Sequence, residues 1–395
     1  MAGFFRYLSG LISVRGPLRE EKRLRSSGIA ISPEIAATFE QYQQQSRQRL
    51  AQYTVENAPV DADEIVKQKA AYCLRPDQSE KGKRRSVLIV HGLTDTAFST
   101  RDLGAFLQSR GFHVLSIVLP GHGTCPGDLP GVTSNDWLRT VAEAIDLVKK
   151  ESDEVYLAGF SIGATLILHH VLAGVKVNGL LLFSPAIRLH RVANLSCFLV
   201  FLSRWLPHFK WLDVLPDTDP YKYETLAMNA ICESALLMKE VRKRLKTQTL
   251  AIPTFISASQ DDATVIGREA LVLFKSLTSK RKRMIYYARQ SVGLPPGVRW
   301  IKSSLPQQGI ISAAHTSAYI HPKNPHYGRQ GRYASCVHLY RNNPEGYLRC
   351  KSLQEDALGE IGVEKNSARV LRRLTFNPWF ETLEDELDKY FMNIE

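Results

Sequence analysis

The segment Gly159-Phe160-Ser161-Ile162-Gly163 places a serine between two glycines, where an apolar strand is expected to turn into a helix. A serine hydroxyl becomes a good nucleophile only when a base holds it in a fixed direction. A sharp turn would lift Ser161 off the end of a sheet, and its crowded backbone leaves room only for small residues at positions 159 and 163. The amide of Ile162, at the start of the helix, would face negative charge forming on a substrate. The pattern predicts a nucleophilic serine, with a plain glycine-flanked turn as the alternative.

A nucleophilic serine needs an orienting acid, and two aspartates follow a later apolar segment. Asp261 and Asp262 come just after residues 251–257, so either would reach the sheet edge at which Ser161 is expected. We favour Asp262 because the spacing Ser259-x-x-Asp262-x-x-Val265 places it in the loop, with Val265 returning to the fold. Asp261 remains the alternative.

The base must be a histidine, and His315 fits best among those that follow Asp262. It ends a short apolar segment that begins at Gly309, and its neighbours are small. The other histidines in this part of the chain precede a proline or lie deep in the tail; they are His321, His326 and His338.

The segment His91-Gly92-Leu93 follows another apolar strand and can supply the second donor to a developing oxyanion. The glycine lets the chain turn close to a substrate, and the Leu93 amide can point inward beside that of Ile162. His91 and His122 are interpreted as structural residues.

The chain from residue 86 alternates between apolar strands and helices, which is typical of a parallel sheet with helices on both faces. Strands are expected at 86–90, 112–118, 154–160, 179–183, 251–257 and 282–288, the last closing the sheet. Helices are expected near 101–110, 135–150, 162–172 and after Val265. A mostly exposed helix at 34–53, starting from Ser32-Pro33, precedes the core, and a helix at 370–391 that is interrupted at Asn377-Pro378 closes it. The tail between His315 and Tyr347 looks loop-like.

Residues of about 188–248 interrupt the alternation without a convincing strand. They carry many large apolar side chains, including Phe198, Phe201, Trp205 and Trp211. We interpret this insertion as a helical cap, with plain packing helices as the alternative.

Composition and charge restrict the class of protein. The 395 residues are 44% hydrophobic and carry a net charge of +12, which favours anionic surfaces. The basic clusters near residues 83 and 281 are short and lack interleaved aromatic residues, so nucleic-acid binding is not expected. The six cysteines form no C-x-x-C pair, which argues against a zinc site and fits reduced thiols in the cytoplasm, although disulfides stay open. The apolar face of residues 4–12 is expected to dock on the protein itself, with membrane contact as the alternative.

In this order the motifs resemble the α/β-hydrolase superfamily, in its monoglyceride lipase and serine aminopeptidase-like branch. The resemblance runs from about Ser86 to His315 and rests on His91-Gly92-Leu93-Thr94, Pro120-Gly121-His122-Gly123, the serine segment, Ser259-Gln260-Asp261-Asp262 and His315. It implies an α/β-hydrolase domain at 86–395, with a helical cap at about 188–248. The helical extension and linker at 1–85 that precede this domain have no counterpart in the minimal family. Carried over by position, the catalytic residues are Ser161, Asp262 and His315, with the amides of Leu93 and Ile162 as oxyanion donors.

The expected activity is hydrolysis of carboxylic esters, with a lipid-like acyl ester as the small-molecule substrate and no cofactor or metal. Three alternatives stay open: acyl transfer or thioester hydrolysis by the same residues, a peptidase, and a non-catalytic binding scaffold. We expect a cytoplasmic protein, with peripheral contact to an anionic membrane as a further option. The long connection from the last expected strand to His315 and the tail beyond it depart from the family pattern.

Overall fold

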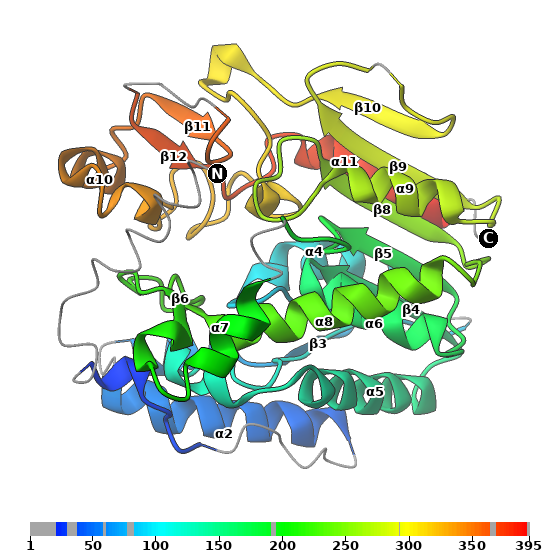
Figure 1. Ribbon diagram of the computed structural model, residues 1–395. Coiled ribbons are helices and arrows are strands. Elements are labelled where there is room, and N and C mark those ends of the chain that lie inside the picture. Colours follow the sequence, from blue (N-terminus) through cyan, green and yellow to red (C-terminus); the bar gives the residue numbers. More distant parts are fainter. Residues whose placement is uncertain are drawn as a thin grey trace.

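An eight-stranded sheet lies at the centre of the computed structural model, which describes residues 21–29, 38–57, 61–76, 83–190, 195–291, 293–363 and 369–392 (Figure 1). Its order is β1-β3-β2-β4-β5-β8-β9-β10. Only β1 is antiparallel to its neighbour; the other pairs are parallel. The predicted α/β-hydrolase fold with a mostly parallel sheet is therefore confirmed.

The central strands are buried along almost their whole length, which is why their sequences read as continuous apolar runs. The prediction that residues 282–288 form the last strand is wrong, because β10 pairs with β9 beyond it. β10 exposes Arg299, Trp300 and Lys302, so it lacks the apolar run that announces a buried strand. The strands are β1 Tyr72–Leu74, β2 Arg85–Val90, β3 His113–Ser116, β4 Glu154–Phe160, β5 Gly179–Phe183, β8 Thr254–Ser259, β9 Lys282–Ala288 and β10 Val298–Lys302.

The helices between these strands begin and end close to where the sequence predicts. The capping box of Thr133 and Asp136 starts α5, and α6 follows Ser161 directly. Within the described ranges no helix combines the length and apolarity needed to span a bilayer. These helices are α4 Arg101–Ser109, α5 Ser134–Lys150, α6 Ile162–Leu172 and α9 Arg268–Ser276; a further helix, α11 Phe380–Met392, comes after all the strands.

The region before residue 86 packs on the sheet and adds a strand to it. It contains α2 (Phe39–Asn57), α3 (Ala62–Lys69) and β1. The prediction that the first long helix is mostly exposed is only partly right, since Phe39 and Tyr42 are each 2% exposed. The apolar face of residues 4–12 and the Ser32-Pro33 helix start lie outside the described residues.

The insertion after β5 contains the helices α7 (Ser196–Leu202) and α8 (Met228–Leu245). It also contains a short antiparallel pair, β6 (Trp211–Asp213) with β7 (Leu226–Ala227), which the sequence analysis missed. Two- and three-residue strands carry too short a pattern to be recognised. Around α7 five large apolar side chains are at least 42% exposed; this α7 patch consists of Leu195, Phe198, Phe201, Trp205 and Leu206.

The described residues between β10 and α11, 303–363 and 369–379, form a C-terminal lobe to one side of the sheet (Figure 1). It contains α10 (Pro344–Lys351) and the parallel pair β11 (Ala357–Gly359) and β12 (Leu371–Arg373). The closing helix predicted from residue 370 is thus wrong over its first part, which is strand, and α11 starts at Phe380, after the Asn377-Pro378 break. Short elements such as β11 need tertiary partners, so their sequence alone does not predict them.

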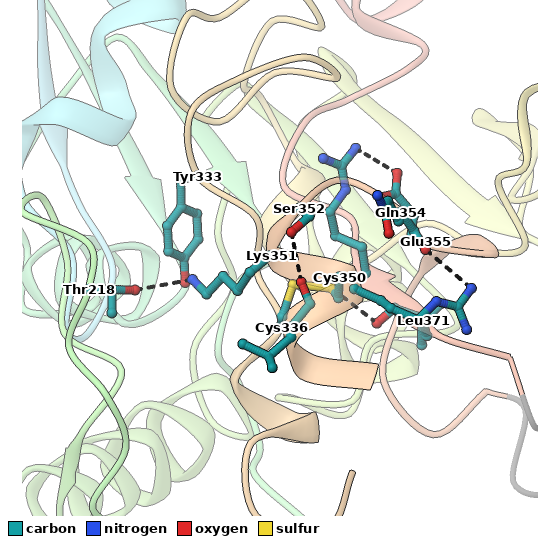
Figure 2. The surroundings of a disulfide bond; sticks show 12 residues. Thr218, Tyr333, Cys336, Cys350, Lys351, Ser352, Gln354, Glu355 and Leu371 are labelled. Carbon is teal, nitrogen blue, oxygen red and sulfur yellow. Dashed lines mark hydrogen bonds and ion pairs between the residues drawn. A yellow bond between two sulfur atoms is a disulfide. The ribbon is translucent and has the colours of Figure 1, made fainter. Parts of the chain in front are cut away.

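Four of the six cysteines form disulfide bonds, so the expectation of reduced thiols is wrong for these four. Cys197 on α7 is bonded to Cys232 on α8, and Cys336 to Cys350 within the C-terminal lobe (Figure 2). Cys73 and Cys125 are free thiols. Since disulfides persist mainly in oxidising compartments, the argument for a cytoplasmic location from reduced cysteines no longer holds.

Candidate active site

Ser161 occupies a strained turn between β4 and α6. Its backbone has φ 54° and ψ −116°, a conformation that residues with a side chain rarely adopt. The two flanking glycines are required by crowding: a Cβ at Gly163 would lie 2.2 Å from the Val90 carbonyl oxygen, and one at Gly159 would lie 2.6 Å from the Ala164 amide nitrogen. The turn thus holds the serine hydroxyl at the carboxyl end of the sheet, as the sequence pattern predicts.

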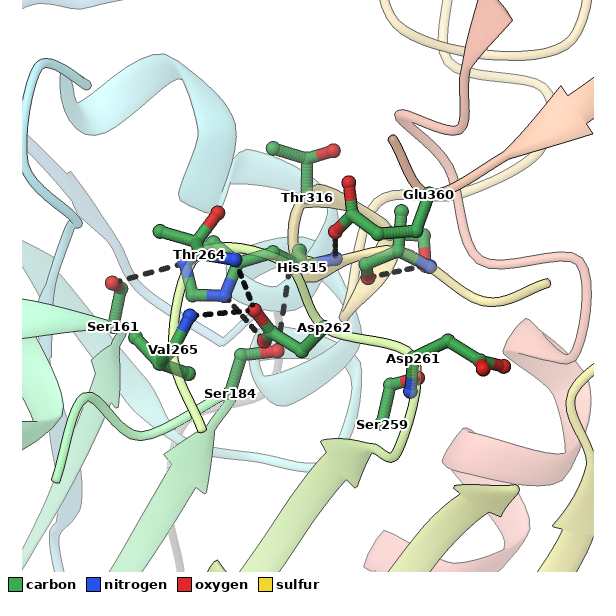
Figure 3. A network of polar contacts seen from close by, with 12 residues as sticks. Ser161, Ser184, Ser259, Asp261, Asp262, Thr264, Val265, His315, Thr316 and Glu360 are labelled. Carbon is green, nitrogen blue, oxygen red and sulfur yellow. Dashed lines mark hydrogen bonds and ion pairs between the residues drawn. The ribbon is translucent and has the colours of Figure 1, made fainter. Parts of the chain in front are cut away.

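The structure brings Ser161, His315 and Asp262 together in one hydrogen-bonded series (Figure 3). His315 Nε2 lies 3.0 Å from Ser161 Oγ, and His315 Nδ1 lies 2.6 Å from Asp262 Oδ2. The other carboxylate oxygen, Asp262 Oδ1, accepts the amides of Thr264 and Val265, each at 2.8 Å. With Nδ1–H donated to the carboxylate, Nε2 is free to accept the serine proton.

The alternative residues are placed elsewhere. Asp261 points away from His315, accepting from Ser303 Oγ at 2.7 Å and Arg289 Nε at 3.2 Å (Figure 3). His326 Nε2 lies 2.9 Å from Asp219 in the insertion after β5. The His321 amide is bound by Asp102. Asp262 and His315 are therefore the acid and histidine that meet at the serine.

The two amides expected to bind an oxyanion belong to Ile162, the residue after Ser161, and to Leu93, in the loop that follows β2. Ile162 is the first residue of α6, where the amides lack intrahelical acceptors. Leu93 follows Gly92, whose added Cβ would lie 3.4 Å from Ser161 Cβ and 2.7 Å from the Phe160 ring. Among the described residues neither the Leu93 nor the Ile162 amide has a hydrogen-bond acceptor. Both are free for a substrate oxygen.

His91 holds the turn of Leu93 in place rather than acting as a base. Its Nδ1 donates to the Gly92 carbonyl at 2.8 Å, and its Nε2 accepts the Leu119 amide at 3.0 Å. Burial, assisted by the neighbouring His122, lowers the pKa of His91 to about 3, so the ring is neutral. Burial likewise lowers the pKa of His122 to about 4. These two rings are structural, in agreement with the sequence interpretation.

His315 is also supported by residues that the sequence did not predict, most of them in the C-terminal lobe. Glu360 accepts the His315 amide at 2.8 Å, and Thr316 Oγ1 donates to the Leu374 carbonyl at 2.8 Å. Ser184, at the end of β5, donates to the His315 carbonyl at 3.3 Å. No motif marks these residues, because the contacts join segments far apart in the chain.

The three side chains lie beneath the surface, with Ser161, Asp262 and His315 exposed by 8%, 7% and 4%. A cavity of about 290 Å³ opens beside Asp262 and is lined by Gln260, Ile266, Leu271 and Tyr286, among others. In the part of the chain that is described, no cluster of histidine, cysteine and carboxylate side chains could hold a metal ion.

Comparison with known proteins gives the family. Residues 81–291, more than half of the chain, match the model of the serine aminopeptidase S33 family of hydrolases. The protein belongs to this family. Ser161 and Asp262 lie inside the matched range, whereas His315 and the C-terminal lobe lie beyond it.

Two curated relatives match about half of the chain. A thermostable monoacylglycerol lipase of Bacillus sp. (strain H-257) is 27% identical over 199 residues, covering 50% of this chain and 79% of the relative. A carboxylesterase of Bacillus subtilis (strain 168) is 24% identical over 212 residues, covering 52% and 84%. Among solved structures, a metagenome-derived lipolytic enzyme aligns with a TM-score of 0.48 at 20% identity, over 55% of this chain and 87% of the other. The assignment to the monoglyceride lipase-like branch, and to hydrolases of the carboxylesterase and lipase class, is confirmed at that level.

Proposed function

We propose that this protein hydrolyses lipid-like acyl esters through Ser161, His315 and Asp262. Ser161 Oγ attacks the ester carbonyl while His315 Nε2 takes its proton, and Asp262 stabilises the imidazolium through Nδ1–H. The amides of Leu93 and Ile162 bind the oxyanion of the tetrahedral intermediate. The alcohol leaves with the proton from His315, and water then attacks the acyl-enzyme by the same route.

The observation that carries the proposal is the hydrogen-bonded series of 3.0 Å and 2.6 Å at the strained turn of Ser161. A histidine within hydrogen-bond distance of the serine, oriented by a carboxylate, is the geometry that activates a hydroxyl nucleophile. The two free amides beside the same hydroxyl support acyl chemistry over a structural role for the serine.

Labelling with a fluorescent fluorophosphonate tests the nucleophile. We expect wild type to be labelled and Ser161→Ala to lose all labelling. Ser86→Ala is the matched control, because Ser86 is also buried but stands at the other end of the sheet, where its hydroxyl lies 2.5 Å from that of Ser152. A well-folded wild type that resists labelling would favour the non-catalytic binding scaffold.

The neighbouring aspartates give an internal test of the acid. Asp262→Asn should lower kcat by roughly 10⁴-fold, because the amide favours the wrong histidine tautomer. Asp261→Asn should keep most of the activity, since Asp261 binds Ser303 and Arg289 instead. Equal losses in the two variants would contradict the proposed role of Asp262.

The substrate class is proposed from the relatives and from the apolar character of the cap. The names of the two curated relatives give one as a monoacylglycerol lipase and the other as a carboxylesterase. p-Nitrophenyl esters of graded chain length, followed by monoacylglycerols, would test it. We expect kcat/KM to rise with acyl length; a maximum at acetate would contradict a lipid-like substrate.

The α7 patch is the proposed contact with an anionic membrane surface. Phe198, Phe201 and Trp205 are 58%, 50% and 65% exposed, and the disulfide from Cys197 to Cys232 ties α7 to α8. Arg204 lies beside the patch, with its guanidinium 5.9 Å from the Phe201 ring centre, and Lys210 is exposed a few residues on. Aromatic rings beside cationic side chains suit an interface of acyl chains and acidic headgroups.

Vesicle sedimentation tests this contact. The protein should bind vesicles containing phosphatidylserine more tightly than those of phosphatidylcholine alone, and Trp205→Ser should weaken the binding. Leu348→Ser is the matched control, because Leu348 is 66% exposed on α10 and far along the chain from the patch. Equal losses in both variants would show that the patch has no special role.

A further inference from the structure

A buried ion pair in the C-terminal lobe reaches the loop of His315. Glu360 directly follows β11, and its side chain has no exposed surface. Arg373, the last residue of β12, binds it with two nitrogens: Nε donates to Oε1 at 2.8 Å and Nη2 to Oε2 at 3.1 Å. A fork of this kind fixes both the distance and the orientation of the two groups.

On one side, Glu360 holds the segment that leads to His315. Its Oε2 accepts the His315 amide at 2.8 Å (Figure 3). Its own amide donates to Ser312 Oγ at 2.8 Å. The adjoining β11 pairs with the same segment, since the Leu358 amide donates to the Gly309 carbonyl at 2.9 Å. The chain before the histidine is therefore bound along its length.

On the other side, Arg373 reaches the loop of the acid. Its Nη2 also donates to Thr264 Oγ1 at 2.8 Å, and the Thr264 amide donates to Asp262 Oδ1 at 2.8 Å. A continuous path of hydrogen bonds thus joins the Asp262 loop to the His315 amide through two side chains of the lobe.

The carboxylate of the pair is fully buried, and the Arg373 side chain is 17% exposed. Burial alone would raise the pKa of Glu360, but the Arg373 guanidinium and the amides of His315 and Ile361 outweigh it and hold that pKa below its ordinary value. Burial would lower the pKa of Arg373, yet Glu360, and to a smaller extent Asp262, keep it raised. Removing one partner would leave an uncompensated charge close to the acid and the base.

We propose that Glu360 and Arg373 are positioning residues that fix the His315 and Asp262 loops relative to one another. The inference rests on the proposed function, because it assigns these residues a role only through His315 and Asp262. A misplacement of about 1 Å in such a site costs roughly 10²-fold in rate. The lobe that lies beyond the family match is in this sense part of the catalytic apparatus.

Glu360→Gln is the decisive variant, because glutamine keeps the shape and an acceptor oxygen but removes the charge. With a p-nitrophenyl ester, kcat should fall about tenfold, with KM changed less than about twofold. The acidic limb of kcat/KM against pH should move to lower pH, because the loss of the carboxylate leaves the positive charge of Arg373 uncompensated beside the site. Arg373→Lys should retain more activity than Arg373→Met.

Glu386→Gln is the matched control for the loss of a buried carboxylate. Glu386 is 3% exposed and pairs with Arg283 and Arg299, toward the opposite end of β9 from the site. This variant should lose stability, but the acidic limb of its kcat/KM profile against pH should not shift. Thr264→Val removes the hydrogen bond from Arg373 Nη2. The variant should fold, and its kcat should fall a few-fold.

The outcomes separate the two proposals. Wild type labelled by fluorophosphonate, together with a pH shift in Glu360→Gln but not in Glu386→Gln, would establish the positioning role. If wild type is labelled and the two glutamine variants behave alike, the positioning role fails and the proposed function stands. If Glu360→Gln does not fold, Thr264→Val decides, and unchanged kcat there overturns the inference. A wild type without labelling overturns both proposals.

Discussion

The residues that meet at Ser161 come from two regions with different construction. The first region is formed by the carboxyl ends of the buried parallel strands, up to β9. It holds Ser161, the Leu93 turn and Asp262 by close backbone packing. The C-terminal lobe, which contains a disulfide of its own, holds His315 with short strands and an ion pair. Close backbone packing leaves little freedom, whereas polar side-chain contacts can be lost one at a time. We therefore expect substitutions in the two regions to fail in different ways.

The largest loss of stability should come from the close backbone contact of Gly163 at the carboxyl ends of the strands. In Gly163→Val the new side chain would meet the Val90 and His91 carbonyl oxygens, 2.2 Å and 2.6 Å from its Cβ, and strand backbone cannot move aside. We expect roughly 3 kcal/mol or more of lost stability in urea unfolding, or no folding. Gly174→Ala is the control: its Cβ meets nothing within 4 Å, and only its φ of +98° opposes it. Similar losses of stability in the two variants would contradict the expected effect of backbone crowding at Gly163.

The lobe should respond as a separate unit when its disulfide is removed. Cys336 and Cys350 are 14 positions apart in the chain, so replacing both by serine should cost about 3 kcal/mol of local stability. Hydrogen exchange measured by mass spectrometry should rise in residues 333–373 and stay unchanged in β2 and β4. An equal rise throughout would mean that the two regions unfold together.

Asp95, in the loop that follows β2, tests the electrostatics at the carboxyl ends of the strands. Burial, opposed in part by Lys222, raises the pKa of Asp95 to about 6. Because Asp95 binds its proton more tightly in the folded than in the unfolded state, protonation of Asp95 stabilises the fold. This contribution is fully present below the unfolded-state pKa near 4 and is lost as pH rises through about 6. Asp95→Asn should abolish this part of the pH dependence and be about 2 kcal/mol more stable than wild type at pH 7. Parallel stability curves for the two proteins between pH 4 and 7 would contradict the expectation.

The smallest of these effects concerns the junction of the C-terminal lobe with the insertion after β5. Tyr327 donates its hydroxyl to the buried carboxylate of Asp219 at 2.7 Å. Nearby, Lys351 donates to Thr218 at 3.1 Å (Figure 2). Tyr327→Phe should lose about 1.5 kcal/mol, because it leaves a charged acceptor short of a donor. Tyr340→Phe, at a residue that is 43% exposed, is the control and should change thermal stability very little.

The same difference explains what the sequence could predict. Strands such as residues 86–90 and 154–160 announce themselves as apolar runs because they are buried on both faces, and the glycines around Ser161 mark a turn with one geometry. The role of Asp262 could be predicted because it lies in the loop just after an apolar strand. His315 was predicted from its small neighbours, but its partner Glu360 was not. Contacts between residues 45 positions apart leave no local pattern.

The two edge strands have a consequence for how copies of the protein meet. One edge is β1, only three residues long, and the other is β10, whose outward residues include Arg299 and Lys302. An open strand edge invites another strand to add to it, and a short edge or a charged one discourages this. The sheet therefore ends on both sides in a way that opposes edge-to-edge aggregation, even though its central strands are among the most apolar segments of the chain.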